Sequence, residues 1–543
     1  MLRFLFALTL ALGLAPNPSR ADSPPPSPLD IDSSIRAVLE AQKTDPIART
    51  AYADSPRQFL WIANGHPTDA AREVAAQLAM ADADGLRPED YQAAALSDAL
   101  GTARASPGGN LAALARLDVE LTVAALRYAH DLHYGRIDPE LVGFGLDIPR
   151  APFDAVALVK RVARGGDASQ AFASAAPKFY HYGLLKAALA HYRRLAQAGD
   201  VTLAPPQRPI RQGDSYVDMA SLRKLLYRLG DLGEADIDST RTFDDKAAAA
   251  LARFQARHGL KANGLLDTTT YKALSTPLAA RVRQIELTLE RWRWIPEFSR
   301  PPIIVNIPQF RLFAFDSLDD RKADILQIDV IVGRTFPSAR TPVFMANMTS
   351  VIFRPYWQVP YSIVRKEIVP KAIRNPNYLA AEKLEIVPAN DEGSKALPAT
   401  RDNVALLASG QLKLRQRPGP ENSLGLIKFS LPNPRDVYLH STPTPALFRE
   451  SARAFSHGCI RVSDPIALAV HVLHDTSAEW TAAAVSTAMR GDQTRHVNLA
   501  HPIPVLILYG TALATEDGKI SFFNDLYGHD ARLTSVLVHA RGQ

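Results

Sequence analysis

A single cysteine is the residue in this chain best suited to covalent chemistry. Cys459 is the only cysteine among 543 residues, and it lies in the string Ser456-His457-Gly458-Cys459-Ile460-Arg461. One thiol forms neither an internal disulfide nor a Cys-rich metal site. A thiol with its ordinary pKa of about 8.5 is mostly protonated at neutral pH, so a nucleophilic cysteine needs a nearby base or positive charge. The sequence predicts such a nucleophile here; the alternative is an inert cysteine that packs as a small hydrophobic group.

Two histidines are candidates for that base. His440 ends an apparent strand in Tyr438-Leu439-His440-Ser441, from which its ring can reach a neighbouring loop, and we expect it to be the general base. The backbone carbonyl of Ser441 could accept the imidazole Nδ1–H and fix the tautomer. His457 stands two residues before the thiol and would share a face with it on a strand. A purely structural role is the alternative for His457.

Several groups around the thiol could stabilise negative charge. Gly458 lets the backbone pass close to a substrate, and the amides of Gly458 and Cys459 could hold an oxyanion. Tyr438 is a candidate hydroxyl donor to the same oxygen, with core packing as the alternative. Arg461 places a positive charge two residues after the thiol, where it could lower the thiol pKa or hold a substrate carboxylate. An ordinary ion pair is the alternative for Arg461.

A second cluster of aromatic and cationic side chains lies upstream, in Phe353-Arg354-Pro355-Tyr356-Trp357-Gln358. Arg354, Tyr356 and Trp357 could line a substrate groove, and core packing explains the aromatic residues equally well. The histidine pairs His130-x-x-His133 and His471-x-x-His474 are interpreted as ordinary helix residues. We therefore expect no metal and no cofactor.

Composition indicates a multidomain globular protein. The length predicts three or four domains, and 47% hydrophobic residues can build sizeable cores. The net charge of +6 is modest for this length, and no Lys/Arg cluster stands out. This pattern argues against a nucleic-acid partner and fits a weak attraction to an anionic polymer or surface.

The N-terminus has the pattern of a secretory signal. Arg3 precedes an apolar run of about eleven residues, too short to span a bilayer, and Ser19-Arg20-Ala21 offers a cleavage site. The sequence predicts a signal peptide over 1–21, with an uncleaved membrane anchor as the alternative. The mature protein is expected to be periplasmic or secreted, and soluble.

Hydrophobic periodicity divides the rest of the chain. A proline-rich leader over 22–30 precedes a helical scaffold domain over 31–200, and a three-helix unit follows over 210–275. A linker helix over 279–300 leads to runs of β-branched and aromatic residues over 302–527, interrupted at about 367–424 by an insertion that could cover the site. Residues 528–543 form a C-terminal tail. The predicted fold class is α+β and multidomain, with a mostly β catalytic domain.

The three-helix unit resembles a known module. Phe254-Gln255-x-x-His258-Gly259-Leu260, then Asn263-Gly264 and Thr269-Thr270 before Leu274, is similar to the peptidoglycan-binding module found beside many cell-wall hydrolases. The resemblance covers about 65 residues. An unrelated three-helix bundle, or a module that serves only as a spacer, is the alternative.

The strings around His440 and Cys459 resemble the signature of the L,D-transpeptidase (YkuD-like) catalytic domain. The resemblance extends to Ile304-Val305-Asn306 and to Val332-Gly333-Arg334 with Thr341-Pro342. Small members of that family often carry Asn where this chain has Arg461, whereas the large periplasmic members are similar to this chain there.

This resemblance implies an acyltransferase. Cys459 would attack a peptidoglycan tetrapeptide stem, release D-alanine and form a thioester, and an amine of a neighbouring stem would resolve it into a 3–3 cross-link. The resemblance also implies association with the cell wall, binding of stem peptides and glycan, acylation by carbapenems, and peptidoglycan synthases as partners. The alternatives are a carboxypeptidase, an endopeptidase or a lipoprotein-linking or lipoprotein-releasing enzyme on the same stems. A non-catalytic wall-binding scaffold is the alternative from another class.

Overall fold

The computed structural model describes residues 27–41, 46–53, 58–105, 110–146, 152–390 and 392–539. The expected signal peptide and most of the expected leader lie outside these ranges. The chain divides into two compact units. The first comprises Met1–Met80, Pro88–Ala129 and Asp154–Ala173, and the second comprises Ala81–Arg87, His130–Phe153 and Ser174–Gln543. Three segments of the helical region expected over 31–200 thus belong to the second unit.

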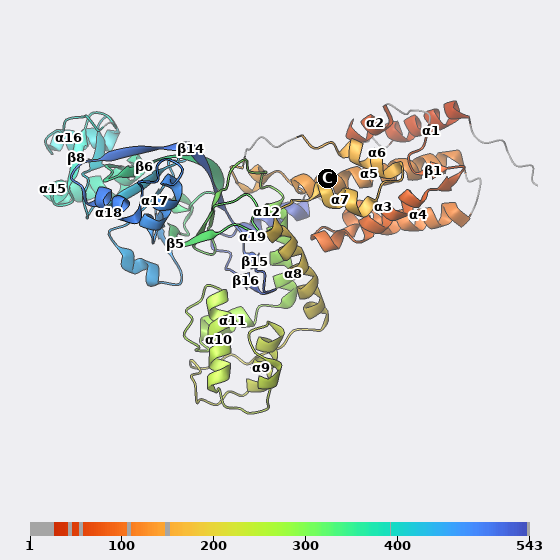
Figure 1. The fold of residues 1–543 in the computed structure, drawn as a ribbon, viewed down its shortest axis with the longest axis horizontal. Helices are drawn as coiled ribbons and strands as arrows, with labels where there is room; N and C mark the ends of the chain where they lie inside the picture. Colours follow the sequence, from red (N-terminus) through yellow and green to blue (C-terminus); the bar gives the residue numbers. More distant parts are fainter. Residues whose placement is uncertain are drawn as a thin grey trace, which may run out of the picture. The chain divides into compact units, whose positions relative to one another are not determined.

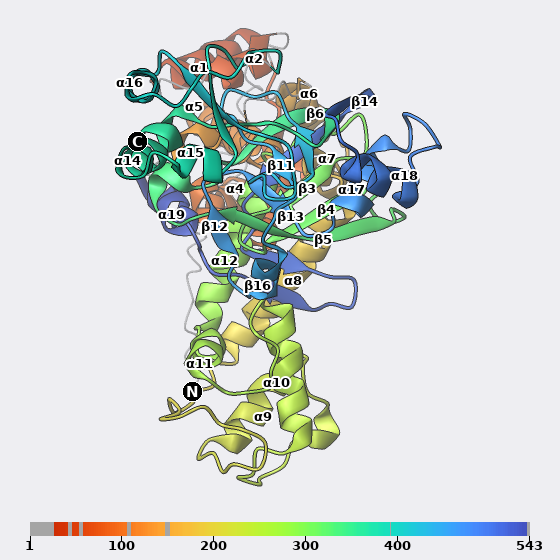
Figure 2. The ribbon, with the colours of Figure 1, turned by 90° about the vertical axis from the view of Figure 1, so that its left-hand side faces the viewer.

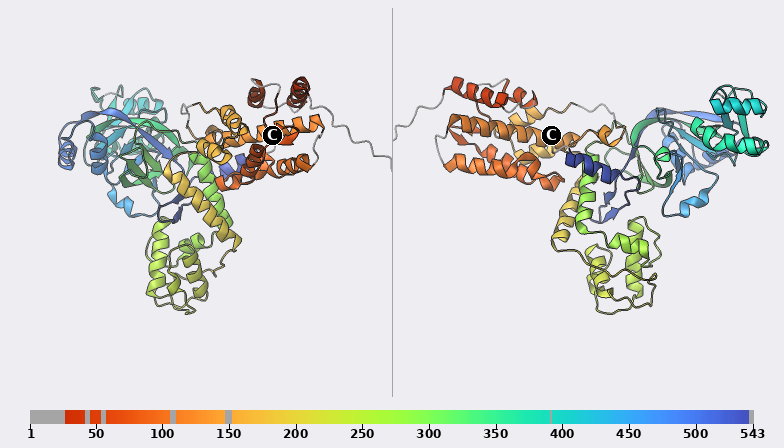
Figure 3. Two further views of the ribbon diagram at one scale, coloured as in Figure 1. Left: turned by 45° about the vertical axis from the view of Figure 1, so that its right-hand side comes forward. Right: turned by 180° about the vertical axis from the view of Figure 1, so that it is seen from behind.

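The first unit is built from helices that lie side by side (Figures 1 and 3). Its helices are α1 (Pro28–Ala41), α2 (Pro46–Ala53), α3 (Asp69–Ala79), α4 (Ala93–Ala105), α5 (Leu111–Tyr134), α6 (Ala155–Ala163) and α7 (Ala168–Ala175), and a small hairpin joins β1 (Ile62–Ala63) to β2 (His66–Pro67). Asp118 of α5 is fully buried, and its carboxylate accepts hydrogen bonds from the Tyr52 hydroxyl and the Trp61 amide, both at 2.7 Å. Burial raises the pKa of Asp118 to about 6.

A three-helix module opens the central part of the second unit. It contains α9 (Met219–Arg228), α10 (Asp245–Arg257) and α11 (Thr268–Leu274). Asp244 and Asp267 cap α10 and α11 by accepting backbone N–H groups, as their positions in the sequence predict. The apolar faces of the three helices form one core of their own.

One buried side chain explains the turn of this module. The Gln255 side-chain amide donates to the Leu265 carbonyl and the Thr270 hydroxyl, and its Oε1 accepts the Gly264 amide at 2.8 Å. Gly264 has φ +67°, and a Cβ there would lie 2.9 Å from the Ala248 carbonyl oxygen. The glutamine and the glycine of the recognised motif therefore fix the backbone between α10 and α11.

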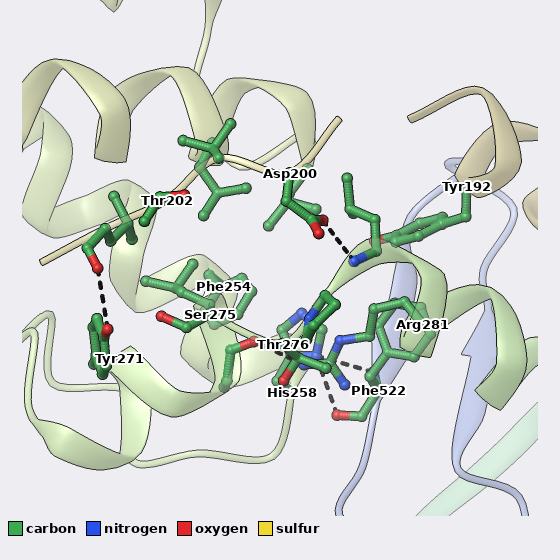
Figure 4. A pocket seen from close by; sticks show the side chains of 18 residues that line it. Tyr192, Asp200, Thr202, Phe254, His258, Tyr271, Ser275, Thr276, Arg281 and Phe522 are labelled. Carbon is green, nitrogen blue, oxygen red and sulfur yellow. Dashed lines mark hydrogen bonds between the residues drawn. The ribbon is translucent and has the colours of Figure 1, made fainter. Parts of the chain in front are cut away.

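A partly open cavity of about 310 Å³ lies beside this module (Figure 4). Phe254, His258 and Tyr271 line it from the module, and Arg281 and Phe522 line it from the segments that follow. The His258 ring stacks parallel to the Phe522 ring and accepts the Phe522 amide at Nδ1. No residue of the Cys459 region lines this cavity.

Two helices and a hairpin connect the module to the catalytic sheet. The helices are α8 (Tyr180–Gln197) and α12 (Leu278–Trp292), and the hairpin pairs β15 (Ala512–Ala514) with β16 (Ile520–Phe522). They share a hydrophobic core that includes Leu189, Leu289 and Phe522.

The β-rich region that follows α12 is built on a sheet that closes on itself as a barrel (Figure 2). The strand order is β12-β5-β13-β11-β10-β6-β14-β3-β4, and β4 also pairs with β5. These strands are β3 (Ile303–Asn306), β4 (Arg311–Phe315), β5 (Ile325–Gly333), β6 (Phe344–Phe353), β10 (Ile427–Ser430), β11 (Leu439–His440), β12 (Ala454–Ser456), β13 (Ile460–Val462) and β14 (Arg495–Leu508). The inner face carries the largest core of the chain, to which α17 (Pro465–Leu473) and α18 (Ala482–Arg490) contribute.

The insertion is a folded subdomain with a core of its own. Its elements gather at one end of the catalytic sheet (Figures 1 and 2). They are β7 (Trp357–Gln358), α13 (Tyr361–Ile363), a π-helical turn (Val364–Ile368), α14 (Val369–Arg374), α15 (Tyr378–Ala381), β8 (Leu384–Val387), α16 (Arg401–Ser409) and β9 (Lys413–Gln416). The strands form a separate sheet in the order β7-β9-β8. This sheet begins about ten residues before Glu367, where the sequence placed the start of the insertion.

Two segments differ from the elements expected from sequence. The β-branched run over residues 504–513 predicts a late strand, but the strand there, β14, already begins at Arg495, because residues 495–498 also pair with β6 although most of them face solvent. Within the expected tail, α19 (His529–His539) buries Leu533 and Leu537 in the catalytic core. Among the described helices, none is both long and apolar enough to cross a membrane.

Candidate active site

Strand register brings the candidate nucleophile and base to one face of the sheet. β13 runs parallel to β11, with Leu439 opposite Ile460 and His440 opposite Arg461. Because successive side chains on a strand point to opposite faces, Leu439 and Ile460 point into the core, where both are fully buried. His440 of β11 and Arg461 of β13 lie on the opposite face, and Tyr438 and Cys459 directly precede these two strands.

The Cys459 thiol lies at the edge of this face and is partly exposed. Its Sγ lies 3.6 Å from the Asp436 carbonyl oxygen, and the backbone N–H and hydroxyl of Tyr438 both act on the sulfur. Burial nevertheless raises the pKa of the thiol above its ordinary value, because it disfavours the charged thiolate. The Cys459 thiol is therefore protonated at neutral pH.

His440 is buried, with 4% of its surface exposed. Burial and the positive charges of Arg461 and Lys428 together lower the pKa of its imidazole to about 3, against the opposing effect of the Ser441 and Leu424 carbonyls. The buried Nδ1 makes no hydrogen bond of ordinary geometry within the described ranges. The His440 imidazole is therefore neutral at neutral pH, the form in which an imidazole can accept a proton.

Tyr438 links the nucleophile, the base and the insertion. Its ring centroid lies 5.7 Å from that of His440, and its hydroxyl interacts with the Cys459 thiol and the Trp357 indole. Burial and the nearby thiolate charge keep the pKa of Tyr438 well above its ordinary value. The hydroxyl therefore remains a proton donor throughout the neutral pH range.

The turn before Cys459 is held by the hydroxyl groups of two residues, Thr341 and Ser456. Thr341 Oγ1 accepts the Gly333 amide and donates to the Gly458 carbonyl, both at 2.8 Å. The Ser456 hydroxyl donates to the Cys459 carbonyl at 2.5 Å and accepts the Gly458 amide at 3.1 Å. Gly458 has φ +122°, a conformation that favours glycine. Its amide is thus paired with the Ser456 hydroxyl, and donation from this amide to an oxyanion stays a prediction.

Ser441 braces the strand that carries His440. Its hydroxyl accepts the amides of Leu426 and Ile427 at 2.8 and 3.2 Å and donates to the Leu424 carbonyl. The Ser441 side chain therefore fixes the chain between β10 and the insertion, while its carbonyl lies beside the His440 ring.

His457 points to the insertion. Its Nε2 lies 2.8 Å from Glu367 Oε1 on the π-helical turn and 2.9 Å from Arg334 at the end of β5. These contacts give His457 a bridging position between the catalytic loop and the insertion.

The upstream aromatic cluster is divided between different surroundings. Trp357 on β7 reaches the Tyr438 hydroxyl. The Tyr356 ring packs against the Arg415 guanidinium, 4.4 Å away, within the insertion. Arg354 has φ +50°, and its amide donates to the Leu426 carbonyl. Of these three residues, the contacts bring Trp357 to the nucleophile's neighbourhood.

Sequence reasoning missed three residues that the structure places around the site: Thr341, Glu367 and Lys428. Thr341 belongs to a recognised string, which was a usable signal. Lys428 and Glu367 gave no signal, because their nearness depends on strand register and on the path of the insertion. No group of three or more potential metal ligands occurs in the part of the chain that the structure describes.

Comparisons with known proteins agree with this geometry. Residues 300–486 match the model described as L,D-transpeptidase catalytic domain (YkuD). Residues 215–274 match the model described as "Putative peptidoglycan binding domain", and residues 47–189 match a scaffold domain.

One curated relative comes from Haemophilus influenzae and is named "Putative L,D-transpeptidase". It is 32% identical over 252 residues, which cover 46% of this chain and 49% of the relative. The chain therefore matches about half the length of that relative. A solved structure from Clostridium acetobutylicum, titled a fused Zn-dependent amidase/peptidase/peptidoglycan-binding domain-containing protein, covers 29% of this chain and 78% of its own, with 16% identity. Its TM-score of 0.11 is too low to support any argument.

These matches define the class of the chain's two recognised parts. The chain carries a YkuD-type L,D-transpeptidase catalytic domain and a peptidoglycan-binding domain.

Proposed function

We propose that this protein is a cysteine L,D-transpeptidase that forms 3–3 cross-links in peptidoglycan. The observation that carries the proposal is the register of β11 against β13: His440 is opposite Arg461, two residues after Cys459, and Tyr438 contacts both the His440 ring and the Cys459 thiol. The thiol is partly exposed at that face, as a nucleophile requires.

The first half-reaction cleaves the donor stem. Sγ of Cys459 attacks the carbonyl that joins the third-position diamino acid to the terminal D-alanine, while the His440 imidazole takes the thiol proton. The Tyr438 hydroxyl donates to the developing oxyanion. The C–N bond then breaks, the imidazolium gives its proton to the leaving amine, and a thioester remains.

The second half-reaction joins two stems. The side-chain amine of a neighbouring diamino acid attacks the thioester and loses its proton to His440. A new amide forms, and the C–S bond breaks to regenerate the thiol. Arg461, Trp357, Tyr356 and Arg354 are proposed to contact the stems, with the contact between Trp357 and Tyr438 giving Trp357 the most direct support.

The proposed reaction has consequences for where the protein works and for what inhibits it. A peptidoglycan-acting enzyme works outside the cytoplasm, in the periplasm or at the wall, where synthases that supply its substrate are natural partners. A strained β-lactam such as a carbapenem offers Cys459 an acyl group, so the thiol is proposed to be acylated by it.

The test compares wild type with Cys459→Ser. Purified protein is incubated with sacculi, which are then digested and analysed by mass spectrometry. We expect new 3–3 dimers with the wild type and none with the variant. Loss of linked or tetrapeptide species without new dimers would replace the transpeptidase by a hydrolase. Unchanged sacculi, together with no carbapenem adduct in the intact mass of the wild type, would leave a wall-binding scaffold.

A further inference from the structure

A lysine with no assigned role stands beside the proposed base. β10 pairs antiparallel with β11, and Lys428 is directly opposite His440. His440 is in turn opposite Arg461 on β13. Because paired residues on neighbouring strands share a face, one row across the sheet reads Lys428, His440, Arg461. The imidazole is therefore bracketed by two cations.

The Lys428 ammonium contacts Tyr438, the residue next to the Cys459 thiol. Its Nζ lies 4.2 Å from the Tyr438 ring centroid, a cation–π distance, and Tyr438 is the residue whose hydroxyl acts on Sγ. Lys428 is half-buried, and within the described ranges it forms no ion pair with a carboxylate.

Partial burial of a cation without a paired anion is unfavourable. Burial accordingly lowers the pKa of Lys428, while the Cys459 thiolate raises it. The effect is reciprocal, since Lys428 also lowers the pKa of Cys459. The negative charge that best compensates Lys428 is thus the one that forms on Sγ during the reaction.

We propose that Lys428 is the electrostatic partner of the catalytic pair: its ammonium stabilises negative charge on Cys459 Sγ and disfavours a second positive charge on His440. The consequence is a division of roles. The sulfur loses its proton more readily, and the imidazole stays neutral and available as a base. This inference deepens the proposed function, and it assigns a role to a residue outside the recognised strings.

Other charged groups surround the same atoms, and the test must separate them from Lys428. The negative charge of Asp436, on the loop before β11, raises the pKa of the Cys459 thiol, whereas Lys428 lowers it. The charges of Asp436 and of Glu392 in the insertion raise the pKa of Lys428. Arg461 has Arg334 as a charged neighbour, and its buried Nε makes no hydrogen bond among the residues described.

The chain allows a direct measurement, because Cys459 is its only cysteine. The rate of iodoacetamide alkylation, followed as intact mass against pH on the full chain, reports the pKa of this thiol alone. Thiolate absorbance in the far ultraviolet gives an independent titration. Neither measurement needs peptidoglycan. A negative result for the role of Lys428 is therefore distinguishable from a failure of the proposed transpeptidase activity.

The variants are Lys428→Met, Lys428→Gln and Lys428→Arg. One charge at neighbouring side-chain distance in a partly buried site shifts a pKa by about one unit. We expect the first two variants to raise the thiol pKa by about one unit and to slow alkylation at pH 7 about tenfold. Lys428→Arg keeps the charge and should stay close to wild type.

The matched control is Lys322→Met, which removes an exposed lysine that lies 3.4 Å from Asp319. It should leave the thiol titration unchanged. An unchanged thiol pKa in folded Lys428→Met and Lys428→Gln would overturn the proposal, as would an equal shift in Lys322→Met. If Lys428→Arg raises the thiol pKa as much as Lys428→Met does, the loss of packing rather than of charge is responsible, and the electrostatic role is refuted.

Discussion

Removing the Thr341 hydroxyl should weaken both the catalytic domain and its nucleophile. Thr341 is 1% exposed, and its Oγ1 makes two 2.8 Å hydrogen bonds, one from the Gly333 amide and one to the Gly458 carbonyl. Thr341→Val keeps the shape but leaves two buried backbone groups unpaired. Each such group costs about 1–3 kcal/mol, so the free energy of unfolding should fall by roughly 2–6 kcal/mol.

The same substitution should slow acylation of Cys459. The Gly458 carbonyl loses its anchor directly before the nucleophile, and a displacement of about 1 Å at a reacting group can cost about a hundredfold in rate. We expect the rate of carbapenem adduct formation to fall by about ten- to a hundredfold. Thermal unfolding measures the first effect: about 2–4 °C per kcal/mol for a domain of this size. Intact-mass kinetics measure the second.

Thr341→Ser is the matched control, because it keeps the hydroxyl and loses one methyl group. It should cost about 1 kcal/mol. Equal melting temperatures and equal acylation rates for Thr341→Val and Thr341→Ser would refute the reasoning, since the hydroxyl would then contribute nothing.

Two further predictions concern pH. Burial lowers the pKa of His440 to about 3 and raises that of Cys459, so the active form with neutral base and protonated thiol should persist between these values. The rate of carbapenem acylation should therefore be flat from about pH 5 to 8.5; a bell-shaped profile centred near pH 6 would instead indicate a thiolate–imidazolium pair. In the first unit, burial raises the pKa of Asp118 to about 6, above its unfolded value of about 3.9. The stability it contributes is complete below about pH 4 and is lost as pH rises through 6, a change of roughly 2–3 kcal/mol that Asp118→Asn should abolish in urea unfolding at pH 4 and 7.

The strand segments and the glycine turn before Cys459 were predictable from the sequence for a clear physical reason. The run Arg311–Phe315 alternates half-buried and buried residues, and Ile303–Asn306 is a short run of β-branched residues that is mostly buried, so both are visible in the sequence. The string around Cys459 combines a reactive residue with a glycine, and the structure gives that glycine a positive φ. Such local chemistry leaves a local signal.

Contacts that depend on strand register left no such signal in the sequence. The row Lys428–His440–Arg461 joins three strands that are separated in sequence, and a shift of one residue would have moved Lys428 to the other face. Residues 495–498 escaped prediction as a strand because their pairing with β6 holds them in place without burying most of their side chains. The paired amide of Gly458 likewise depends on the rotamer of Ser456, which no pattern of residues fixes.

The insertion and the barrel each bury their own apolar residues: the insertion around Leu379, Ile386 and Leu414, and the barrel around Val305, Val351 and Phe429. Replacements that reshape the insertion can therefore accumulate without unfolding the strands that hold Cys459. Libraries aimed at a different acyl acceptor should diversify residues 361–416 and leave the sheet untouched, because tolerance to change and proximity to the thiol coincide there.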